Sequence, residues 1–108
     1  MDQQVIGALR RMKGALEVEG IRVKRLIVFG SHAQGRGAAD SDIDVAIISD
    51  DFRGMTLLER LETIGGILAR ARIMEPIECL AWTEEELRAK GEGSFVADEV
   101  KMKGVEVL

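Results

Sequence analysis

Apolar residues recur along this chain at spacings that distinguish helices from buried strands. Over residues 2–19 they follow a helical repeat with basic residues between them, which predicts an amphipathic helix. Residues 23–29 and 42–48 contain uninterrupted aliphatic or aromatic runs, which predict two short strands in the core. Several glycines separate these two runs, so we expect a turn between the strands.

A second helical repeat carries six aliphatic side chains at core spacing (Leu57, Leu58, Leu61, Ile64, Ile67 and Leu68). Thr56 and Glu59 form a capping-box pattern at its start, and we expect this helix to pack in the core. Gly65 and Gly66 lie in its middle, where a glycine destabilises a helix by about 1 kcal/mol relative to alanine. Two glycines there indicate either close packing against a neighbour or a local kink.

Pro76 excludes a helix at the start of the last third of the chain, and the apolar residues 77–82 predict another strand. A second capping-box pattern at Thr83 opens a short helix. A further helix follows, and residues 105–108 alternate as an edge strand does. The order of elements predicts one α/β domain over residues 1–108, with a small mixed sheet flanked by helices.

The turn after the first predicted strand has the composition of a phosphate-binding corner. Gly30 lets the chain bend and lets a ligand approach the backbone, because glycine has no Cβ atom. Ser31 can cap a following helical turn whose free N–H groups face the same ligand. Gly35 then helps the chain to reverse toward the second strand.

Two aspartates lie at the start of the second predicted strand. Asp42 and Asp44 are two residues apart, so their carboxylates point to the same side of a strand. At the mouth of an apolar strand they repel each other and lose hydration unless a cation neutralises both. Mg²⁺ or Mn²⁺ is the natural cation, because these metals bind paired carboxylates together with substrate phosphates.

These residues resemble the sequence pattern of a known superfamily. Gly30-Ser31, Ala33, Gly35 and Ser41-Asp42-Ile43-Asp44 match the GSxAxG and SDID motifs of the DNA polymerase beta-like nucleotidyltransferases. The chain is most similar to the minimal nucleotidyltransferases of the MntA type. This resemblance implies the nucleotidyltransferase fold, an aspartate pair that holds two Mg²⁺ ions, and a nucleoside triphosphate, expected to be ATP, whose β- and γ-phosphates bind at Gly30 and Ser31.

The resemblance extends the nucleotide site to Gly35, Arg36 and Ser41. Family members often carry several arginines in this stretch, whereas this chain offers only Arg36. His32 lies in the same turn. It either donates to a phosphate, takes part in proton transfer, or has only a structural role.

The family also places a third carboxylate, usually aspartate, on the strand after the core helix, and Glu78 matches that position. A charged residue within an apolar strand is costly to bury without a partner, so Glu78 should face solvent or a cation. Its longer side chain can still bind a metal or accept a proton. Glu75 is the rival, but Pro76 separates it from the strand. We therefore expect Asp42, Asp44 and Glu78 to be both metal ligands and catalytic groups.

Composition excludes several other classes of protein. The chain has 46% hydrophobic and 31% charged residues, and no apolar run is long enough to cross a bilayer. Its net charge of −4 argues against a broad nucleic-acid-binding surface. A single cysteine permits no internal disulfide, and no signal-peptide pattern opens the sequence, so we expect a cytoplasmic protein.

The resemblance further implies a protein partner. Minimal nucleotidyltransferases often accompany a HEPN-domain toxin as its antitoxin, and some transfer AMP to a tyrosine of that toxin. We expect either such a transferase or a non-catalytic antitoxin that binds a nucleotide or its partner and acts by contact alone. A free-standing transferase for a small molecule is disfavoured because no acceptor-binding domain is visible. A homo-oligomer is compatible with the sequence.

Overall fold

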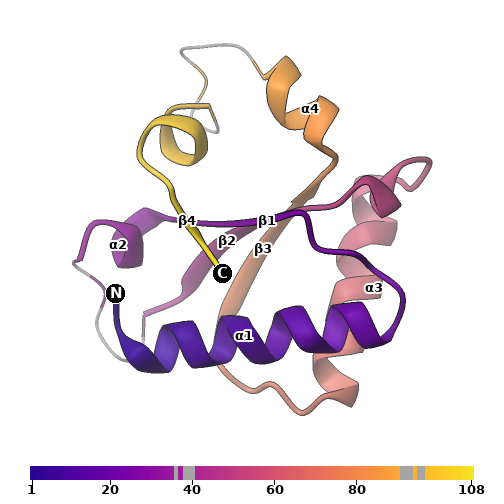
Figure 1. The fold of residues 1–108 in the computed structure, drawn as a ribbon, viewed down its shortest axis with the longest axis horizontal. Coiled ribbons are helices and arrows are strands. Elements are labelled where there is room, and N and C mark those ends of the chain that lie inside the picture. Colours follow the sequence, from indigo (N-terminus) through magenta and orange to yellow (C-terminus); the bar gives the residue numbers. More distant parts are fainter. Residues whose placement is uncertain (36, 38–40, 91–93, 95–96) are drawn as a thin grey trace.

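Four strands form one mixed sheet with helices on both of its faces, as seen in a computed structural model that describes residues 1–35, 37, 41–90, 94 and 97–108 (Figure 1). The strands are β1 (Arg25–Phe29), β2 (Ile43–Ile48), β3 (Ile77–Trp82) and β4 (Val105–Val107). The helices are α1 (Gln3–Val18), α2 (Gly30–Ala33), α3 (Leu57–Arg70) and α4 (Glu84–Ala89), with a 3₁₀ turn η1 (Asp50–Phe52) and a π-helical turn η2 (Ala97–Met102).

The strand order is β3-β2-β1-β4. β1 runs antiparallel to both β2 and β4, whereas β2 and β3 are parallel. Because parallel strands need a crossover connection, α3 links β2 to β3. The sheet is therefore the small mixed sheet that the order of elements predicts, with β4 as the expected edge strand and β3 at the opposite edge.

Alternation along the strands divides the core into two apolar layers. On one face, α1 and α3 cover Val28, Val45 and Ile47. On the other face, α4 and η2 cover a smaller layer (Ile27, Phe29, Ala46, Ile48 and Trp82, beneath Leu87 and Val100). Asp44 precedes Ala46 by two positions on β2, so it belongs to this second face.

Most elements lie where the sequence pattern predicts them, with small shifts at their ends. Both capping boxes are formed, because the Thr56 and Thr83 hydroxyls accept hydrogen bonds from the backbone N–H groups of Glu59 and Glu86. Within the described residues, no helix combines the length and apolar character that crossing a membrane requires.

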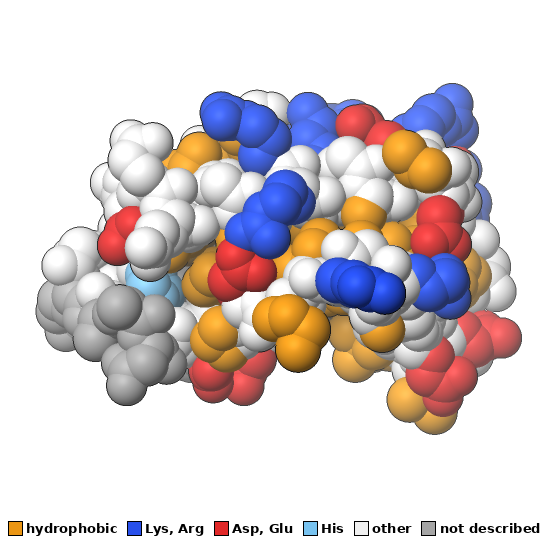
Figure 2. Space-filling model, turned by 90° about the horizontal axis from the view of Figure 1, so that it is seen from below, with side chains coloured by type: hydrophobic (Ala, Val, Ile, Leu, Met, Phe, Trp, Pro, Cys, Tyr) orange, Lys and Arg blue, Asp and Glu red, His pale blue; other side chains and the backbone are white. Residues whose placement is uncertain are grey.

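α3 packs in the core as expected, but three of its six aliphatic residues are exposed. Ile64 and Ile67 are buried, but Leu57, Leu58 and Leu61 are 60%, 66% and 45% exposed. Helical spacing gives only the phase of an apolar stripe, and the stripe of α3 is wider than the sheet covers. Hydrophobic side chains also reach the surface between charged ones on the face shown in Figure 2.

The two glycines of α3 do not interrupt the helix, which runs continuously through Gly65 and Gly66. A Cβ atom added to Gly65 would meet nothing within 4 Å, so no contact with the described residues requires glycine there. A Cβ atom on Gly66 would approach only the guanidinium of Arg70. Close packing against the described residues, one of the two explanations that the sequence offers, therefore does not account for Gly65.

Arg60 of α3 is buried against β3, although it is not part of the apolar repeat that predicts the helix. Its side chain is only 4% exposed. Nε donates to the Met55 carbonyl and Nη1 to the Ala81 carbonyl, at 3.1 and 3.0 Å. The guanidinium also donates to both carboxylate oxygens of Glu86, at 2.5 and 3.0 Å. These bonds attach α3 to the end of β3 and to the start of α4.

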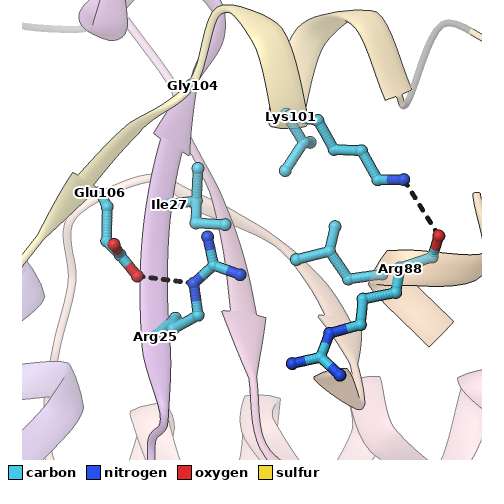
Figure 3. Close-up of a pocket in the computed structure, with 8 residues that line it drawn as sticks. Arg25, Ile27, Arg88, Lys101, Gly104 and Glu106 are labelled. Atoms are coloured by element: carbon cyan, nitrogen blue, oxygen red, sulfur yellow. Dashed lines mark hydrogen bonds and ion pairs between the residues drawn. The ribbon is translucent and has the colours of Figure 1, made fainter. Parts of the chain in front are cut away.

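Edge strand β4 is attached to the sheet by a second arginine. Arg25 Nε donates to Glu106 at 2.6 Å and Arg25 Nη1 donates to Glu84 at 3.1 Å. Figure 3 shows Arg25 and Glu106 at one side of a pocket of about 370 Å³, with Ile27 at its floor and Arg88 and Lys101 opposite. This pocket lies between η2, α4 and β1, and its charges are largely paired within the protein.

Glu86→Gln should lower the free energy of unfolding by about 1–2 kcal/mol, because it removes the charge that faces a buried guanidinium while water screens the exposed part of the pair. Glutamine can still complete the capping box. Hydrogen bonds from Arg60 lower the pKa of Glu86 from 4.5 to about 2. Ionised Glu86 therefore stabilises the fold above the unfolded pKa of 4.5, and this contribution declines as the pH falls toward about 2.

Urea unfolding of both proteins at neutral pH and at about pH 4 checks this expectation. The difference between wild type and variant should be largest at neutral pH. A difference that stays constant, or that grows in acid, would show that the ion pair does not stabilise the fold.

Candidate functional site

The turn at the end of β1 depends on glycine for two independent reasons. Gly30 has φ +72°, a backbone conformation that residues with a Cβ atom rarely adopt. A Cβ atom there would also collide with Oδ2 of Asp44 on the neighbouring strand. The four-residue helix α2 starts at this glycine, so its first N–H groups lie beside the Asp44 carboxylate.

Three carboxylates meet next to this turn, and we call Asp42, Asp44 and Glu78 the acidic cluster. The register of the parallel strands sets Asp44 of β2 directly opposite Glu78 of β3. Antiparallel pairing sets Asp44 opposite Phe29, the last residue of β1. Asp42 lies just before β2 and is exposed, as is Glu78, whereas Asp44 is half-buried.

Electrostatics within the acidic cluster are unfavourable without a cation. The pKa of Glu78 is raised, because its carboxyl group lies within hydrogen-bonding reach of Asp44 and beside the negative charge of Asp42. No lysine or arginine in the described ranges forms an ion pair with any of the three carboxylates. A cation brought from outside would relieve this repulsion.

The acidic cluster offers only carboxylate oxygens to a divalent metal. In the part of the chain that the structure describes, no three His, Cys, Asp or Glu side chains are arranged as a ready metal site. Mg²⁺ does not need such a cage, because it commonly binds one or two carboxylates and completes its shell with water and substrate phosphates. The all-oxygen donor set, the unrelieved repulsion and the adjacent Gly30 turn therefore fit Mg²⁺ bound together with a phosphate ligand.

The structure separates the two glutamates that compete for the third position. Glu75 lies before β3 and forms an ion pair with Arg11 of α1. A hydrogen bond from Arg11 lowers the pKa of Glu75, so this carboxylate is already neutralised. Glu78 instead lies within the strand, beside both aspartates. The geometry brings Glu78 to the acidic cluster and ties Glu75 to α1.

His32 lies inside the turn that joins β1 to β2. It is only 7% exposed, and its Nε2 lies 3.2 Å from the carbonyl oxygen of Ser41. A Cβ atom on Gly37 would collide with the imidazole ring, so the chain closes tightly around it. Of the roles that the sequence leaves open, this geometry favours a structural one, in which His32 positions the segment that leads to Asp42. In the sequence, the position of His32 between Gly30 and Gly35 is what hints at its contact with the Ser41 carbonyl.

The remaining residues predicted for the nucleotide site surround the same turn. Ser31 is half-buried within α2, and exposed Gly35 follows α2 with φ +72°. Ser41 is half-buried immediately before Asp42. Arg36 lies outside the described residues. Gly30, Ser31 and Ser41 thus lie next to the acidic cluster along the chain or in space, and Gly35 lies at the end of α2.

Comparison of the sequence with known families gives one match. The family described as nucleotidyltransferase domain matches residues 9–106, which includes the Gly30 turn and the whole acidic cluster. No curated protein matches the sequence.

Several solved structures share the fold. A toxin–antitoxin complex with AMP-PNP is 18% identical, with a TM-score of 0.59 over 90% of this chain and 69% of that chain. A candidate nucleotidyltransferase from Sulfolobus solfataricus is 18% identical, with a TM-score of 0.55 over 98% of this chain and 87% of that chain. BolA1 from Arabidopsis thaliana is 18% identical, with a TM-score of 0.54 over 73% of this chain and 94% of that chain. Because proteins of different kinds share it, this likeness shows the fold alone.

Replacing Gly30 by alanine should destabilise the protein more than replacing Gly35, although both have φ +72°. Gly35→Ala introduces only backbone strain, about 1 kcal/mol, because a Cβ atom there has open space. Gly30→Ala adds the collision with Asp44 and should cost about 1–3 kcal/mol more. Urea unfolding measures both, and equal losses would show that Asp44 does not constrain position 30.

Asp44→Asn should raise or leave unchanged the melting temperature of the metal-free protein, because it removes one of three neighbouring negative charges at constant volume. Mg²⁺ should raise the melting temperature of the wild type but not of this variant. Asp50→Asn, at the other end of β2, should keep the Mg²⁺ response. If Asp44→Asn melts several degrees lower and Mg²⁺ changes neither protein, Asp44 is structural and the metal assignment is wrong.

Proposed function

Because the chain belongs to the nucleotidyltransferase domain family, we propose that it transfers a nucleoside monophosphate, AMP from ATP, to a hydroxyl group of a partner protein. The observation that carries this proposal is the register of β2 and β3, which sets Glu78 opposite Asp44 beside the Gly30 turn. Clustered carboxylates next to free backbone N–H groups suit a triphosphate that binds with its metal.

The turn after β1 would hold the triphosphate. The backbone at Gly30 and Ser31 receives the β- and γ-phosphates, because N–H groups in a first helical turn have no acceptor within the helix. Gly35 and Ser41 border the same space and contact the nucleotide. Arg36 adds a positive charge for the phosphates. The missing Cβ atom of Gly30 makes room for the Asp44 carboxylate beside this backbone.

The acidic cluster would hold the metal, for which we propose two Mg²⁺ ions. Asp42 and Asp44 are its main ligands, and Glu78 either completes the ligand set or accepts a proton. When bound, the metal supplies a positive charge that stabilises the transferring phosphoryl group. Neutralising three clustered carboxylates at the same time removes the repulsion that raises the pKa of Glu78.

The reaction exchanges one phosphorus–oxygen bond for another. The acceptor oxygen bonds to the α-phosphorus, while the bond from the α-phosphorus to the oxygen that bridges to the β-phosphate breaks and pyrophosphate leaves. Glu78 receives the hydroxyl proton and passes it to water. Its exposure makes this transfer accessible, and the strand holds it beside the aspartates.

We further propose that the acceptor is a HEPN-domain toxin and that this chain is its antitoxin, acting where ATP and Mg²⁺ are present in the cytoplasm. Similarity to a toxin–antitoxin complex that contains AMP-PNP supports this reading. A second candidate is an antitoxin that neutralises by contact alone. It is favoured by Glu78, which stands where the family usually has aspartate.

Glu78→Gln should lower the transfer rate at least about 100-fold while ATP and Mg²⁺ still bind, because a proton acceptor acts chiefly in the transition state. The assay incubates the protein with its partner, labelled ATP and Mg²⁺, and follows label in the partner. Toxin neutralisation is measured in parallel. Glu75→Gln is the matched control, since Glu75 pairs with Arg11 outside the acidic cluster, and it should label the partner normally.

The same assay separates the two candidate functions. The transferase is supported if Glu78→Gln loses both partner labelling and toxin neutralisation while Glu75→Gln still labels the partner. If the wild type transfers no label from any nucleotide, and neutralisation survives in both Glu78→Gln and Asp44→Asn, catalysis is excluded and contact alone explains the protein.

A further inference from the structure

An apolar groove runs between α3 and β3, on the surface beside the acidic cluster. Leu57, Leu61, Leu80, Ala81 and Trp82 line it. We call it the α3–β3 groove. All five lining side chains are apolar, and two of them, Leu57 and Leu61, are 60% and 45% exposed. Contiguous exposed apolar surface of this kind typically marks a binding site for another protein.

The fold itself does not use the leucines of this groove. α3 contacts the core through Arg60, Ile64 and Ile67, which lie along one side of the helix. Leu57 and Leu61 lie on the adjoining side, so the apolar arc of α3 is wider than the part that the sheet covers. Leu58 widens the exposed arc further, at 66% exposure. These exposed leucine side chains are available to a second molecule.

Gly65 lies one turn beyond Leu61 on the same side of α3. A Cβ atom there would meet nothing within 4 Å, although glycine destabilises a helix interior. No contact within the described chain requires this glycine. A helix that packs across α3 would require it, because small residues let two helix backbones approach closely. Gly65 therefore favours a helix as the occupant of the groove.

Two exposed carboxylates lie near the groove, and one lysine lies at its far end. Glu62 follows Leu61 on α3 and is exposed, and Glu78 lies on the groove strand. The two arginines of α3 do not offset these charges, because Arg60 is paired with Glu86 and Arg70 with Glu19. At the far end, Lys90 stacks over the ring of Trp82. A partner with lysine or arginine beside its apolar residues complements this rim.

The groove also lies close to the proposed chemistry. Leu80 and Glu78 point to the same side of β3, two residues apart, which is roughly 7 Å along a strand. A helix seated in the groove therefore approaches Glu78 along edge strand β3. A hydroxyl group carried at its end, or on the loop that follows it, is within reach of Glu78.

We propose that the α3–β3 groove is the docking surface for a helix of the acceptor protein, with an aliphatic stripe flanked by lysine or arginine. This inference rests on the proposed function, because it names how the acceptor reaches the acidic cluster. Charge complementarity and the open Gly65 position select a basic amphipathic helix over other occupants.

The test replaces two groove leucines by lysine in the full chain. Leu57→Lys combined with Leu61→Lys should weaken binding to the HEPN-domain partner at least about 30-fold, because it places charge at a desolvated contact and repels a basic partner. Val18→Lys combined with Met74→Lys is the matched control, since these side chains are 86% and 85% exposed away from the groove. Calorimetry measures partner binding, and ATP with Mg²⁺ is titrated separately.

The two measurements distinguish failure of the docking surface from failure of the proposed function. Partner binding that is lost in the groove variant but kept in the control, with ATP binding intact in both, supports the groove. Equal partner affinity in both variants, or a wild type that binds ATP and Mg²⁺ but not the partner, overturns it. Wild-type dimers that dissociate only in the groove variant, seen by sedimentation, would assign the groove to a second copy and also overturn it. A wild type that binds no ATP overturns the proposed function instead.

Discussion

Parallel pairing of β2 with β3 forces like charges together, and this repulsion is the constraint around which the site is built. Asp44 and Glu78 are register partners, so neither can move away without breaking the ladder between their strands. The apolar residues that follow each of them hold that ladder inside the core. Burial of these apolar residues stabilises the sheet and offsets the repulsion within the acidic cluster, a common arrangement at functional sites.

Two arginines hold the elements that frame this arrangement. Arg60 joins α3 to the end of β3 and to α4, while Arg25 joins β4 and α4 to β1. Both lie away from the acidic cluster and already have carboxylate partners. These arginines thus neutralise carboxylates of the scaffold and leave the acidic cluster negative, as the proposed binding of Mg²⁺ with a nucleotide requires.

Local patterns in the sequence were sufficient for the helices, the strands and both capping boxes, because these depend on residues only a few positions apart. Alternation also placed Asp42 and Asp44 on one side of β2. The position of Glu78 opposite Asp44 is different in kind, since it depends on register between strands that α3 separates. No local pattern encodes that register, and the resemblance to a family supplied it. The burial of Arg60 and the exposure of Leu57 were missed for a related reason: spacing defines a stripe on a helix but not which part of it the sheet covers.

The long connection between β2 and β3 has a consequence for how the site comes into existence. Asp42 and Asp44 leave the ribosome well before Glu78, and a parallel pair cannot close until the intervening helix has formed and packed. A partly synthesised chain therefore carries the aspartate pair without the carboxylate that opposes it. The acidic cluster therefore forms only after residues 77–82 have joined the sheet.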